Sequence, residues 1–340
     1  MTAPGEIGRL LVANMPRMTA DRIGGAALAN AHANRAFLQR GASIAALRNE
    51  QLGQGDSAVV IAAGPSIKRR DPIRAIKEAG YRGAIIATDS AIAYCLRSGV
   101  VPDLVVTLDP HATRIVRWFG DPKLNAEALK ADDYYRRQDM DPAFADEMRF
   151  NKTILELLDR HGKDMRIALS TSASSAVVER VLQTGMRIFW WNPMLDDPDG
   201  AGGATRELYG INGLPCVNAG GNVGAACWMF AAEVLGKKRV ALTGVDFSYY
   251  DGTPYSATQY YREAVDLVGA ENLDSIYVRI HNPFLDAWFF TDPAYLWYRD
   301  AFLDMAGESD CLTYNCTEGG ILFGEPIRFV PLSVFLQASA

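Results

Sequence analysis

The stretch Ser57-Ala-Val-Val-Ile-Ala-Ala-Gly-Pro-Ser-Ile67 decides the fold, because it joins an apolar strand directly to a Gly-Pro-Ser turn. Its run of small and branched residues is too short for a helix and is typical of a central strand in a parallel sheet. Gly64 lets a ligand approach the backbone, Pro65 favours a turn, and Ser66 can cap a following helix. Such a turn offers N–H groups to an anion, usually a phosphate, and an ordinary tight strand-to-helix turn explains it equally well.

The composition is typical of a globular protein, with 49% hydrophobic and 22% charged residues among 340. The net charge of −6 argues against a nucleic-acid partner, which would need a concentrated basic face. Two short basic clusters, Lys68–Arg70 and Lys237–Arg239, are interpreted as solvated surface. No hydrophobic run reaches the roughly 20 residues of a membrane span, and the N-terminus lacks the pattern of a secretory signal.

The cysteines form no Cys-x-x-Cys pair; they are Cys95, Cys216, Cys227, Cys311 and Cys316. An odd number in a chain of this length predicts reduced thiols and a cytoplasmic protein. No His or Cys partners complete a zinc pattern around Cys311 and Cys316, so we expect no structural metal.

From residue 57 onward, predicted strands alternate with helices, which indicates an α/β fold with a Rossmann-like, mainly parallel sheet flanked by helices. The predicted strands are 57–63, 83–88, 103–108, 165–169, 187–192 and 238–243, and the predicted helices are 71–79, 90–98, 174–184 and 223–235. Residues 1–50 are expected to form a helical lead-in, with helices over 26–38 and 43–52. Residues 51–335 would form the main domain. Its charged, Tyr- and Arg-rich segment 111–163 is interpreted as a helical insertion at the carboxyl edge of the sheet.

Polar residues follow five of the predicted strands: Gly64-Pro65-Ser66, Thr88-Asp89-Ser90, Asp109-Pro110-His111, Ser170-Thr171-Ser172 and Gly244–Tyr250. Ligands of open α/β sheets bind beyond the carboxyl ends of the strands. Helix capping explains Ser90 or Ser172 as well as ligand contact does. Five converging polar ends are harder to explain by capping alone, so we expect one pocket that holds an activated phosphate ester.

Other candidate groups lie further along the chain. The glycine-rich turn Asn218–Gly224, with Gly221 and Asn222, has N–H groups that can hold a phosphate or a carboxylate, although it matches no standard phosphate-binding motif. Tyrosine hydroxyls near the sixth strand can donate to a phosphate, and aromatic residues at this density can equally pack a loop.

Two histidines, His111 and His281, are candidates for a general base. His111 follows Asp109 at a strand end, and His281 is expected just after a short strand and ahead of an aromatic helix. Since no nucleophile elbow is present, hydrolase chemistry is disfavoured.

Together these motifs resemble the bacterial motility accessory factor proteins. The resemblance rests on residues 63–67, 88–92, 99–109, 221–224, 232–236 and 242–252, and it extends over about residues 45–325. That family shares a domain type with archaeal 6-hydroxymethylpterin diphosphokinases and is distantly similar to bacterial sialyltransferases. The motility proteins are usually longer, so the chain is expected to lack flanking parts that grip flagellin.

The resemblance implies a glycosyltransferase that moves a nonulosonic, sialic-type sugar from a CMP donor to a hydroxyl group of flagellin or of another protein or glycan acceptor, with no cofactor required. It also implies that Gly64, Pro65 and Ser66 line the nucleotide pocket, with Asp89 near the nucleotide and Asp109 near the sugar. Two tyrosines, Tyr255 and either Tyr249 or Tyr250, would match a pair that holds the donor phosphate. His281 falls roughly where the sialyltransferases keep their base.

Two alternatives stay open. One is an ATP-dependent diphosphokinase that acts on a pterin-like alcohol, with Mg²⁺ on Asp89 and Asp109, since Mg²⁺ prefers one or two carboxylates plus substrate phosphates. The other is a non-catalytic nucleotide-binding protein. The sequence leaves the sugar, the acceptor and the oligomeric state open, a homo-oligomer included.

Overall fold

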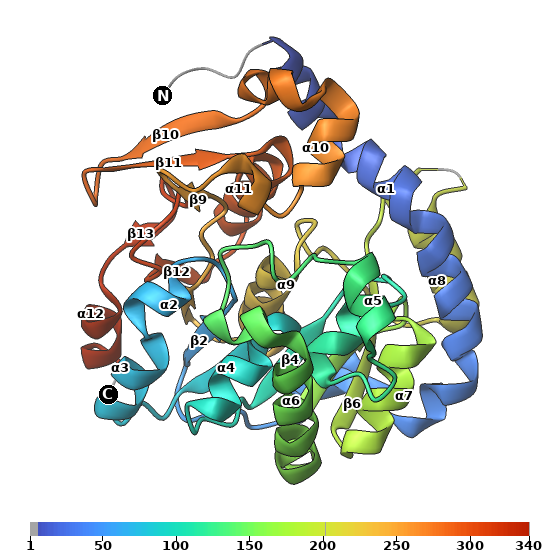
Figure 1. Cartoon of the computed structure of the whole chain (residues 1–340). Coiled ribbons are helices and arrows are strands. Elements are labelled where there is room, and N and C mark those ends of the chain that lie inside the picture. Colours follow the sequence, from blue (N-terminus) through green and yellow to red (C-terminus); the bar gives the residue numbers. More distant parts are fainter. Residues whose placement is uncertain (1–5, 201, 340) are drawn as a thin grey trace.

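The computed structural model describes residues 6–200 and 202–339 as a three-layer α/β protein (Figure 1). Its strands are β1 (Ala42–Ser43), β2 (Ser57–Ile61), β3 (Ala84–Thr88), β4 (Leu104–Thr107), β5 (Arg166–Ser170), β6 (Arg187–Pro193), β7 (Cys216–Val217), β8 (Arg239–Thr243), β9 (Tyr249–Tyr250), β10 (Val278–Asn282), β11 (Ala287–Thr291), β12 (Leu312–Asn315) and β13 (Arg328–Phe329). Its α-helices are α1 (Glu6–Asn34), α2 (Ile67–Arg70), α3 (Pro72–Glu78), α4 (Ile92–Arg97), α5 (Ala126–Ala131), α6 (Glu147–His161), α7 (Ser175–Thr184), α8 (Ala204–Asn212), α9 (Val223–Met229), α10 (Tyr261–Val268), α11 (Pro293–Gly307) and α12 (Leu332–Gln337).

One large sheet has the strand order β1-β6-β5-β4-β3-β2-β8-β12-β13, with β7 paired to β6. All of these pairs are parallel. Helices cover both faces: in Figure 1, α4 and α6 lie in front of the sheet and α9 lies behind it. The predicted Rossmann-like α/β fold is therefore confirmed.

The six predicted strands are all present within two residues of their expected bounds, and β2 shows why. Each of its residues is buried. Val59 packs with residues of α3, α4 and α12, whereas Val60 packs on the opposite face with residues of α9. A strand covered on both faces is apolar at every position, and this makes it visible in the sequence.

The order of the sheet reverses between β2 and β8. Strands β3, β4, β5 and β6 add on one side of β2, and β8 and β12 add on the other. The Gly64 N–H donates to the Gly244 carbonyl at 2.9 Å, so the turns that follow β2 and β8 lie side by side. Such a reversal leaves a crevice beyond the carboxyl ends of the strands, where ligands of open α/β sheets bind.

The N-terminal helices differ from the prediction. One continuous helix, α1, runs to Asn34 in place of a helix over 26–38, and only short 3₁₀ helices follow, at Arg35–Arg40 and Ile44–Asn49. The Asn34 amide donates to the Thr171 and Ala173 carbonyls, both at 2.8 Å, so tertiary contacts anchor the end of α1. Residues 1–5 of the predicted lead-in lie outside the described part of the chain.

The segment 111–163 is helical throughout its regular structure. It contains 3₁₀ helices at Ile115–Phe119 and Pro142–Asp146 together with α5 and α6. The helix predicted over 223–235 is present as α9, which continues as a π-helix at Phe230–Val234. The domain boundaries proposed from the sequence stay predictions.

A second, antiparallel sheet with the order β10-β11-β9 lies at the top of Figure 1, where the sequence predicted only one short strand before His281. His281 lies inside β10 and pairs with Trp288 of β11, so its expected position just past the strand is wrong, and β11 separates it from the aromatic helix α11. The alternation of buried Val278 and Ile280 with exposed Arg279 is the sequence signal for this strand. In the described parts of the chain, no helix combines the length and the apolar character needed to cross a membrane.

Candidate functional site

A cavity of about 230 Å³ lies at the β2–β8 reversal. The sheet side of its lining includes Ala62, Ala63, Gly64, Pro65, Thr88, Asp89, Ser90, Asp109, Gly221, Asn222, Gly244, Asp246 and Tyr249. The other side includes Trp118, Tyr134, Gln138, Asp139, Met140, Gln259, Tyr260, Tyr295 and Tyr298. Four of the five polar strand ends therefore reach one cavity. The fifth, Ser170–Ser172, does not line it, because Asn30 and Asn34 of α1 bind the backbone carbonyls there.

Asp246 forms the floor of the cavity beside the first glycine turn. A Cβ atom on Gly64 would lie 2.2 Å from Asp246 Oδ2, so this approach requires glycine. The Ser66 hydroxyl donates to Oδ2 at 2.8 Å, and Oδ1 is buried with no partner. Burial raises the pKa of the Asp246 carboxyl to about 7. Near neutral pH, Asp246 is therefore poised between an acid that donates a hydrogen bond and a carboxylate that accepts one.

Ser66 does not play the role expected of it. It is buried, it is not among the residues lining the cavity, and its side chain caps no helix. Its backbone already has helical dihedral angles, whereas a capping residue needs an extended one. Ser66 instead holds Asp246, and the turn reaches the cavity through Gly64 and Pro65.

The two other predicted aspartates both line the cavity, in different environments. Asp89 is buried, and burial raises the pKa of its carboxyl to about 7. Its Oδ1 accepts the Ser90 N–H at 2.7 Å. Asp109 is solvent-exposed and accepts the His111 N–H at 2.7 Å. The cavity thus has one buried and one accessible carboxyl group at neighbouring strand ends.

The second glycine turn also reaches the cavity. Gly221 has a φ of 77°, and a Cβ there would lie 2.6 Å from the Trp297 ring, so the close packing against α11 requires glycine. Asn222 caps α9 by accepting the Ala225 N–H at 2.9 Å, while its amide donates to the Gly220 carbonyl. The Asn222 side chain therefore maintains the turn.

Tyrosines form much of the wall opposite the sheet. The hydroxyls of Tyr260 and Tyr298 lie 3.0 Å apart, and the Tyr295 hydroxyl donates to the Gln259 side chain at 2.6 Å. Burial raises the pKa of all three phenols. These tyrosines stay neutral across the physiological pH range and present hydroxyl groups without charge.

The three tyrosines predicted to hold a phosphate lie in three different places. Tyr249 lines the cavity, but its hydroxyl donates to Asp292 and accepts the Gln259 N–H. Tyr250 is not among the lining residues; its hydroxyl is buried without a partner. Tyr255 stacks on the Tyr277 ring, at 4.2 Å between centroids, away from the cavity lining. The structure does not bring a Tyr249–Tyr255 or Tyr250–Tyr255 pair together in the cavity.

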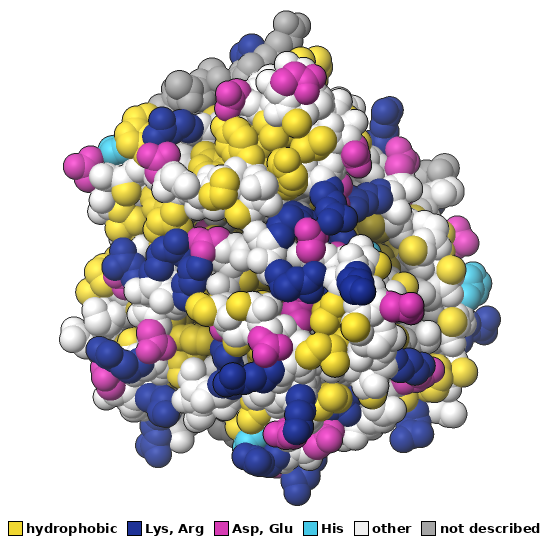
Figure 2. All heavy atoms as spheres, viewed as in Figure 1, with side chains coloured by type: hydrophobic (Ala, Val, Ile, Leu, Met, Phe, Trp, Pro, Cys, Tyr) yellow, Lys and Arg dark blue, Asp and Glu magenta, His cyan; other side chains and the backbone are white. Residues whose placement is uncertain are grey.

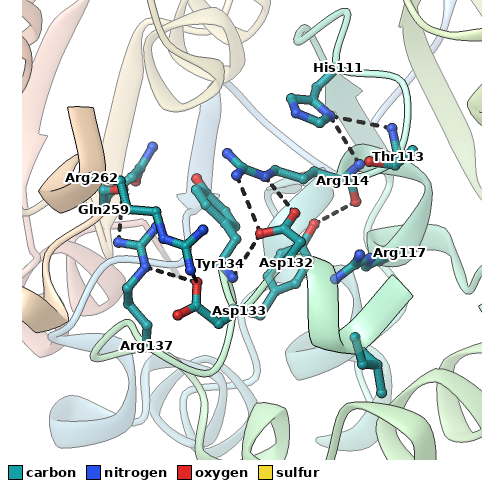
Figure 3. Close-up of polar contacts among 12 residues, drawn as sticks. His111, Thr113, Arg114, Arg117, Asp132, Asp133, Tyr134, Arg137, Gln259 and Arg262 are labelled. Carbon is teal, nitrogen blue, oxygen red and sulfur yellow. Dashed lines mark hydrogen bonds and ion pairs between the residues drawn. The ribbon is translucent and has the colours of Figure 1, made fainter. Parts of the chain in front are cut away.

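His111, whose N–H donates to Asp109, is also held by its own loop. Figure 3 shows the ring beside Thr113 and Arg114. Its Nδ1 accepts the backbone N–H groups of Thr113 and Arg114, at 3.3 and 3.2 Å. In the neutral ring the proton then lies on Nε2, and protonation of Nδ1 would break both bonds. Burial also lowers the pKa of His111. This geometry disfavours His111 as a base.

His281 lies outside the cavity. Its Nε2 pairs with Asp286 at 3.0 Å, and its ring packs beside Trp288 on the second sheet. His281 is not among the residues lining the cavity. The antiparallel hairpin, which the sequence interpretation lacked, is what directs this side chain elsewhere.

Two arginines flank Tyr134 where the insertion meets the cavity (Figure 3). The guanidinium carbons of Arg114 and Arg137 lie 4.3 and 5.8 Å from the centre of its ring. Arg114 pairs with Asp132 and Arg137 with Asp133, so acidic partners compensate both charges. Figure 2 shows the same mixture on this face, with Lys and Arg side chains across its middle and acidic side chains between them.

Arg137 also joins the insertion to the segment before α10. Its Nη1 donates to the Thr258 carbonyl at 2.5 Å and to the Gln259 carbonyl at 3.2 Å. We use the term cover for residues 133–141 and 258–260, which meet through these bonds. The cover closes the side of the cavity opposite the sheet.

The interpretation of the two basic clusters as solvated surface needs correction. Lys68 and Arg69 both pair with Asp139 of the cover. Lys237 is buried, and its Nζ donates to the Leu52 and Gly55 carbonyls. Neighbours in sequence do not reveal such long-range acceptors.

Several lining residues were given no individual role from the sequence. Asp246 lies within the predicted polar strand end Gly244–Tyr250, whereas the others lie outside the five strand ends. Tyr134, Gln138 and Asp139 had only the Tyr-rich composition of the insertion as a signal, and Tyr295 and Tyr298 had none beyond an aromatic helix. Within residues 6–200 and 202–339, no group of three or more His, Cys, Asp or Glu side chains is placed to hold a metal ion.

Comparisons with known proteins agree with the expected resemblance. Residues 29–121 match the family described as 6-hydroxymethylpterin diphosphokinase MptE-like. The fold is similar to that of a MAf glycosyltransferase from Magnetospirillum magneticum AMB-1, with a TM-score of 0.51 and 16% sequence identity over 87% of this chain. The chain spans 41% of the length of that protein. A search of curated proteins found no match.

Proposed function

We propose that this chain is a glycosyltransferase that moves a nonulosonic sugar from a CMP donor to a hydroxyl group of a protein or glycan. The observation that carries the proposal is the convergence of four polar strand ends on one cavity at the β2–β8 reversal. Activated phosphate esters bind at such a point in open α/β sheets. The likeness in fold to a glycosyltransferase supports this choice of chemistry.

The donor phosphate would lie over the Gly64–Pro65 turn, beside Asp246. A neutral carboxylic acid can donate a hydrogen bond to an anion, as carboxyl groups with a raised pKa do in other enzymes. The raised pKa of Asp246 suits this role, and Tyr260 and Tyr298 add neutral hydroxyl groups on the opposite wall. Loss of one donor to the departing CMP would cost roughly 2.7–4 kcal/mol by analogy with oxyanion holes.

The acceptor proton would go to Asp109. The acceptor oxygen forms a bond to the anomeric carbon while the bond from that carbon to the phosphate oxygen breaks, and CMP leaves with the electron pair. A protein or glycan acceptor arrives from solvent, and Asp109 is the exposed carboxyl group of the cavity. Neither His111 nor His281 is among the residues that line the cavity.

The test is transfer by an Asp109→Asn variant with a CMP-sialic acid donor. The expected loss of transfer is about 10²- to 10⁴-fold, the usual contribution of a general base, with CMP affinity retained. Asp121→Asn is the matched control, because each of the two carboxylates accepts the N–H group two residues further along the chain, and Asp121 does not line the cavity. Transfer by Asp109→Asn at the wild-type rate would show that this assignment is wrong.

A diphosphokinase is the second candidate, favoured by the match over residues 29–121. Asp89 and Asp109 both line the cavity and fit the one or two carboxylates that Mg²⁺ uses with substrate phosphates. Bound Mg²⁺ would supply charge to orient the ATP phosphates. Sensitivity to a chelator separates the two functions, because the sugar-transfer reaction predicts little effect.

A thermal-shift screen with CMP, CDP, ATP and CMP-sialic acid separates the candidate ligands. A ligand raises stability by RT ln(1 + [L]/Kd), so the preferred nucleotide gives the largest shift. Stabilisation by CMP and CMP-sialic acid supports sugar transfer, whereas stabilisation by ATP alone supports the diphosphokinase. CMP binding with no transfer to any acceptor would indicate a non-catalytic protein.

A further inference from the structure

Asp139 places a carboxylate between the cover and the first glycine turn. Its Oδ2 lies 2.8 Å from Arg69 Nη2, and its Oδ1 pairs with Lys68 Nζ. The Asp139 side chain is only 16% exposed and lines the cavity. One carboxylate therefore forms ion pairs with two cationic side chains at the edge of the cavity.

The two cations lie in α2, just after the turn that the proposed function assigns to the donor phosphate. Only Ile67 separates Lys68 from Ser66, and Arg69 Nη1 donates to the Pro65 carbonyl at 2.6 Å. The Arg69 guanidinium lies 3.9 Å above the Tyr250 ring, which fixes its plane. Lys68 lines a small adjoining cavity that shares Gly64 and Met140 with the main one.

With Asp139 in place, the main cavity lacks cationic side chains and is small for a nucleotide-sized ligand. Within the described chain, no lysine or arginine is among the residues that line it. Its volume of about 230 Å³ is below the roughly 300–1,000 Å³ of typical small-molecule sites. Displacement of Asp139 would supply both, because it frees two cations and moves the cover outward.

We propose that Lys68 and Arg69 form a subsite for a phosphate group, and that Asp139 occupies this subsite in the absence of ligand. This inference rests on the proposed placement of the phosphate at the Gly64–Pro65 turn. An incoming phosphate replaces the carboxylate on the same donors, so the charge-assisted hydrogen bonds are exchanged and not lost. Phosphate binding and closure of the cover at Asp139 are then mutually exclusive.

The test measures binding of pyrophosphate and of CMP by isothermal titration calorimetry. Asp139→Asn removes the competing charge, and we expect it to tighten both ligands about 5-fold or more, at the lower end of typical coupling between linked events. Arg69→Gln should weaken both ligands. In the double variant, the gain from Asp139→Asn should be smaller than in the wild-type background.

Asp159→Asn is the matched control. Asp159 pairs with Arg180, and neither residue belongs to the cover or lines the main or the adjoining cavity. Its loss should leave affinity for both ligands unchanged. Equal or weaker binding by Asp139→Asn, an equal gain from Asp159→Asn, or no pyrophosphate binding by any variant overturns the proposal.

Hydrogen exchange gives a readout that a merely structural Asp139 would not produce. The amides of residues 133–141 should exchange faster when pyrophosphate binds wild-type protein, and equally fast in Asp139→Asn without ligand. Slower hydrogen exchange of residues 133–141 when pyrophosphate binds would contradict the replacement of the Asp139 carboxylate by a phosphate group.

The failures of the two proposals are distinguishable. Tighter pyrophosphate binding by Asp139→Asn without sugar transfer to any acceptor would retain the subsite and reject the glycosyltransferase. Sugar transfer that depends on Asp109, with pyrophosphate and CMP affinities unaffected by Asp139→Asn, would retain the glycosyltransferase and reject the subsite.

Discussion

The two sides of the cavity are built in different ways. On the sheet side, short turns after β2, β3, β4 and β8 place polar groups at fixed positions, and buried strands on both sides hold each turn. On the cover side, residues 133–141 and 258–260 meet through side-chain bonds such as those of Arg137. Rigid strand ends can position a phosphate, while a cover held by ion pairs can exchange partners. If the two proposals hold, ligand binding belongs to the sheet side and access to the cavity belongs to the cover.

The largest effect is expected on the sheet side, from Gly64→Val. The new Cβ would lie 2.2 Å from Asp246 Oδ2 and 2.4 Å from the Gly244 carbonyl oxygen, so the β2 and β8 turns must separate. We expect a loss of more than about 4 kcal/mol in the free energy of unfolding, as for the severest substitutions, measured by urea denaturation. Gly210→Ala in α8 meets nothing within 4 Å and should stabilise by about 0.5–1 kcal/mol. Wild-type stability of Gly64→Val would show that the sheet side is not rigid.

The next effect concerns the buried Asp89 and depends on pH. Its pKa is about 7 in the folded protein, against an ordinary value of 3.8. Between these values the folded state holds a proton that the unfolded chain has lost, so this group lowers stability as the pH rises through that range. Asp89→Asn should therefore be more stable than wild type at pH 8, by on the order of a few kcal/mol, and the difference should vanish near pH 4. Thermal melts across this range measure it, and a difference independent of pH would contradict burial as the cause.

A moderate effect is expected on the cover, from Arg137→Met. The substitution leaves the Thr258 and Gln259 carbonyls without their side-chain donor, which costs about 1–3 kcal/mol for buried acceptors. We expect this loss mainly as faster hydrogen exchange in residues 255–260, with little change in β2 and β8. Arg262→Met is the control, because Arg262 also pairs with Asp133 but is 55% exposed. An equal increase in hydrogen exchange in residues 255–260 and in β2 and β8 would show that the cover and the sheet side do not differ in rigidity.

The smallest effect is expected from His281→Ala. His281 pairs with exposed Asp286 on the second sheet and does not line the cavity. The proposed sugar transfer should stay within about twofold, since surface substitutions of this kind change stability by about 0.5 kcal/mol or less. A loss comparable to that of Asp109→Asn would mean that the second sheet closes over the cavity during the reaction and that the base is His281.

The sequence predicted much of the sheet side. The six strands, the glycine turns, Asp89 and Asp109 all follow from patterns that are local in the chain, and residues of both glycine turns and both aspartates line one cavity. The cover could not be predicted in the same way. Asp139 and Arg69 are 70 residues apart in the sequence, and nothing in the composition of either segment marks them as partners.

By itself, the sequence determined the parallel sheet and most of the strand ends that line its cavity. Burial on both faces requires continuous apolar strands, and close approach of two turns requires glycine. Both requirements can therefore be recognised from residues that are adjacent in the sequence. Only the tertiary structure decided which tyrosines line the cavity, why His281 lies apart from it, and which carboxylate pairs with Lys68 and Arg69. Those choices depend on the relative placement of distant segments, because a side chain can reach any partner that packing brings within a few ångströms.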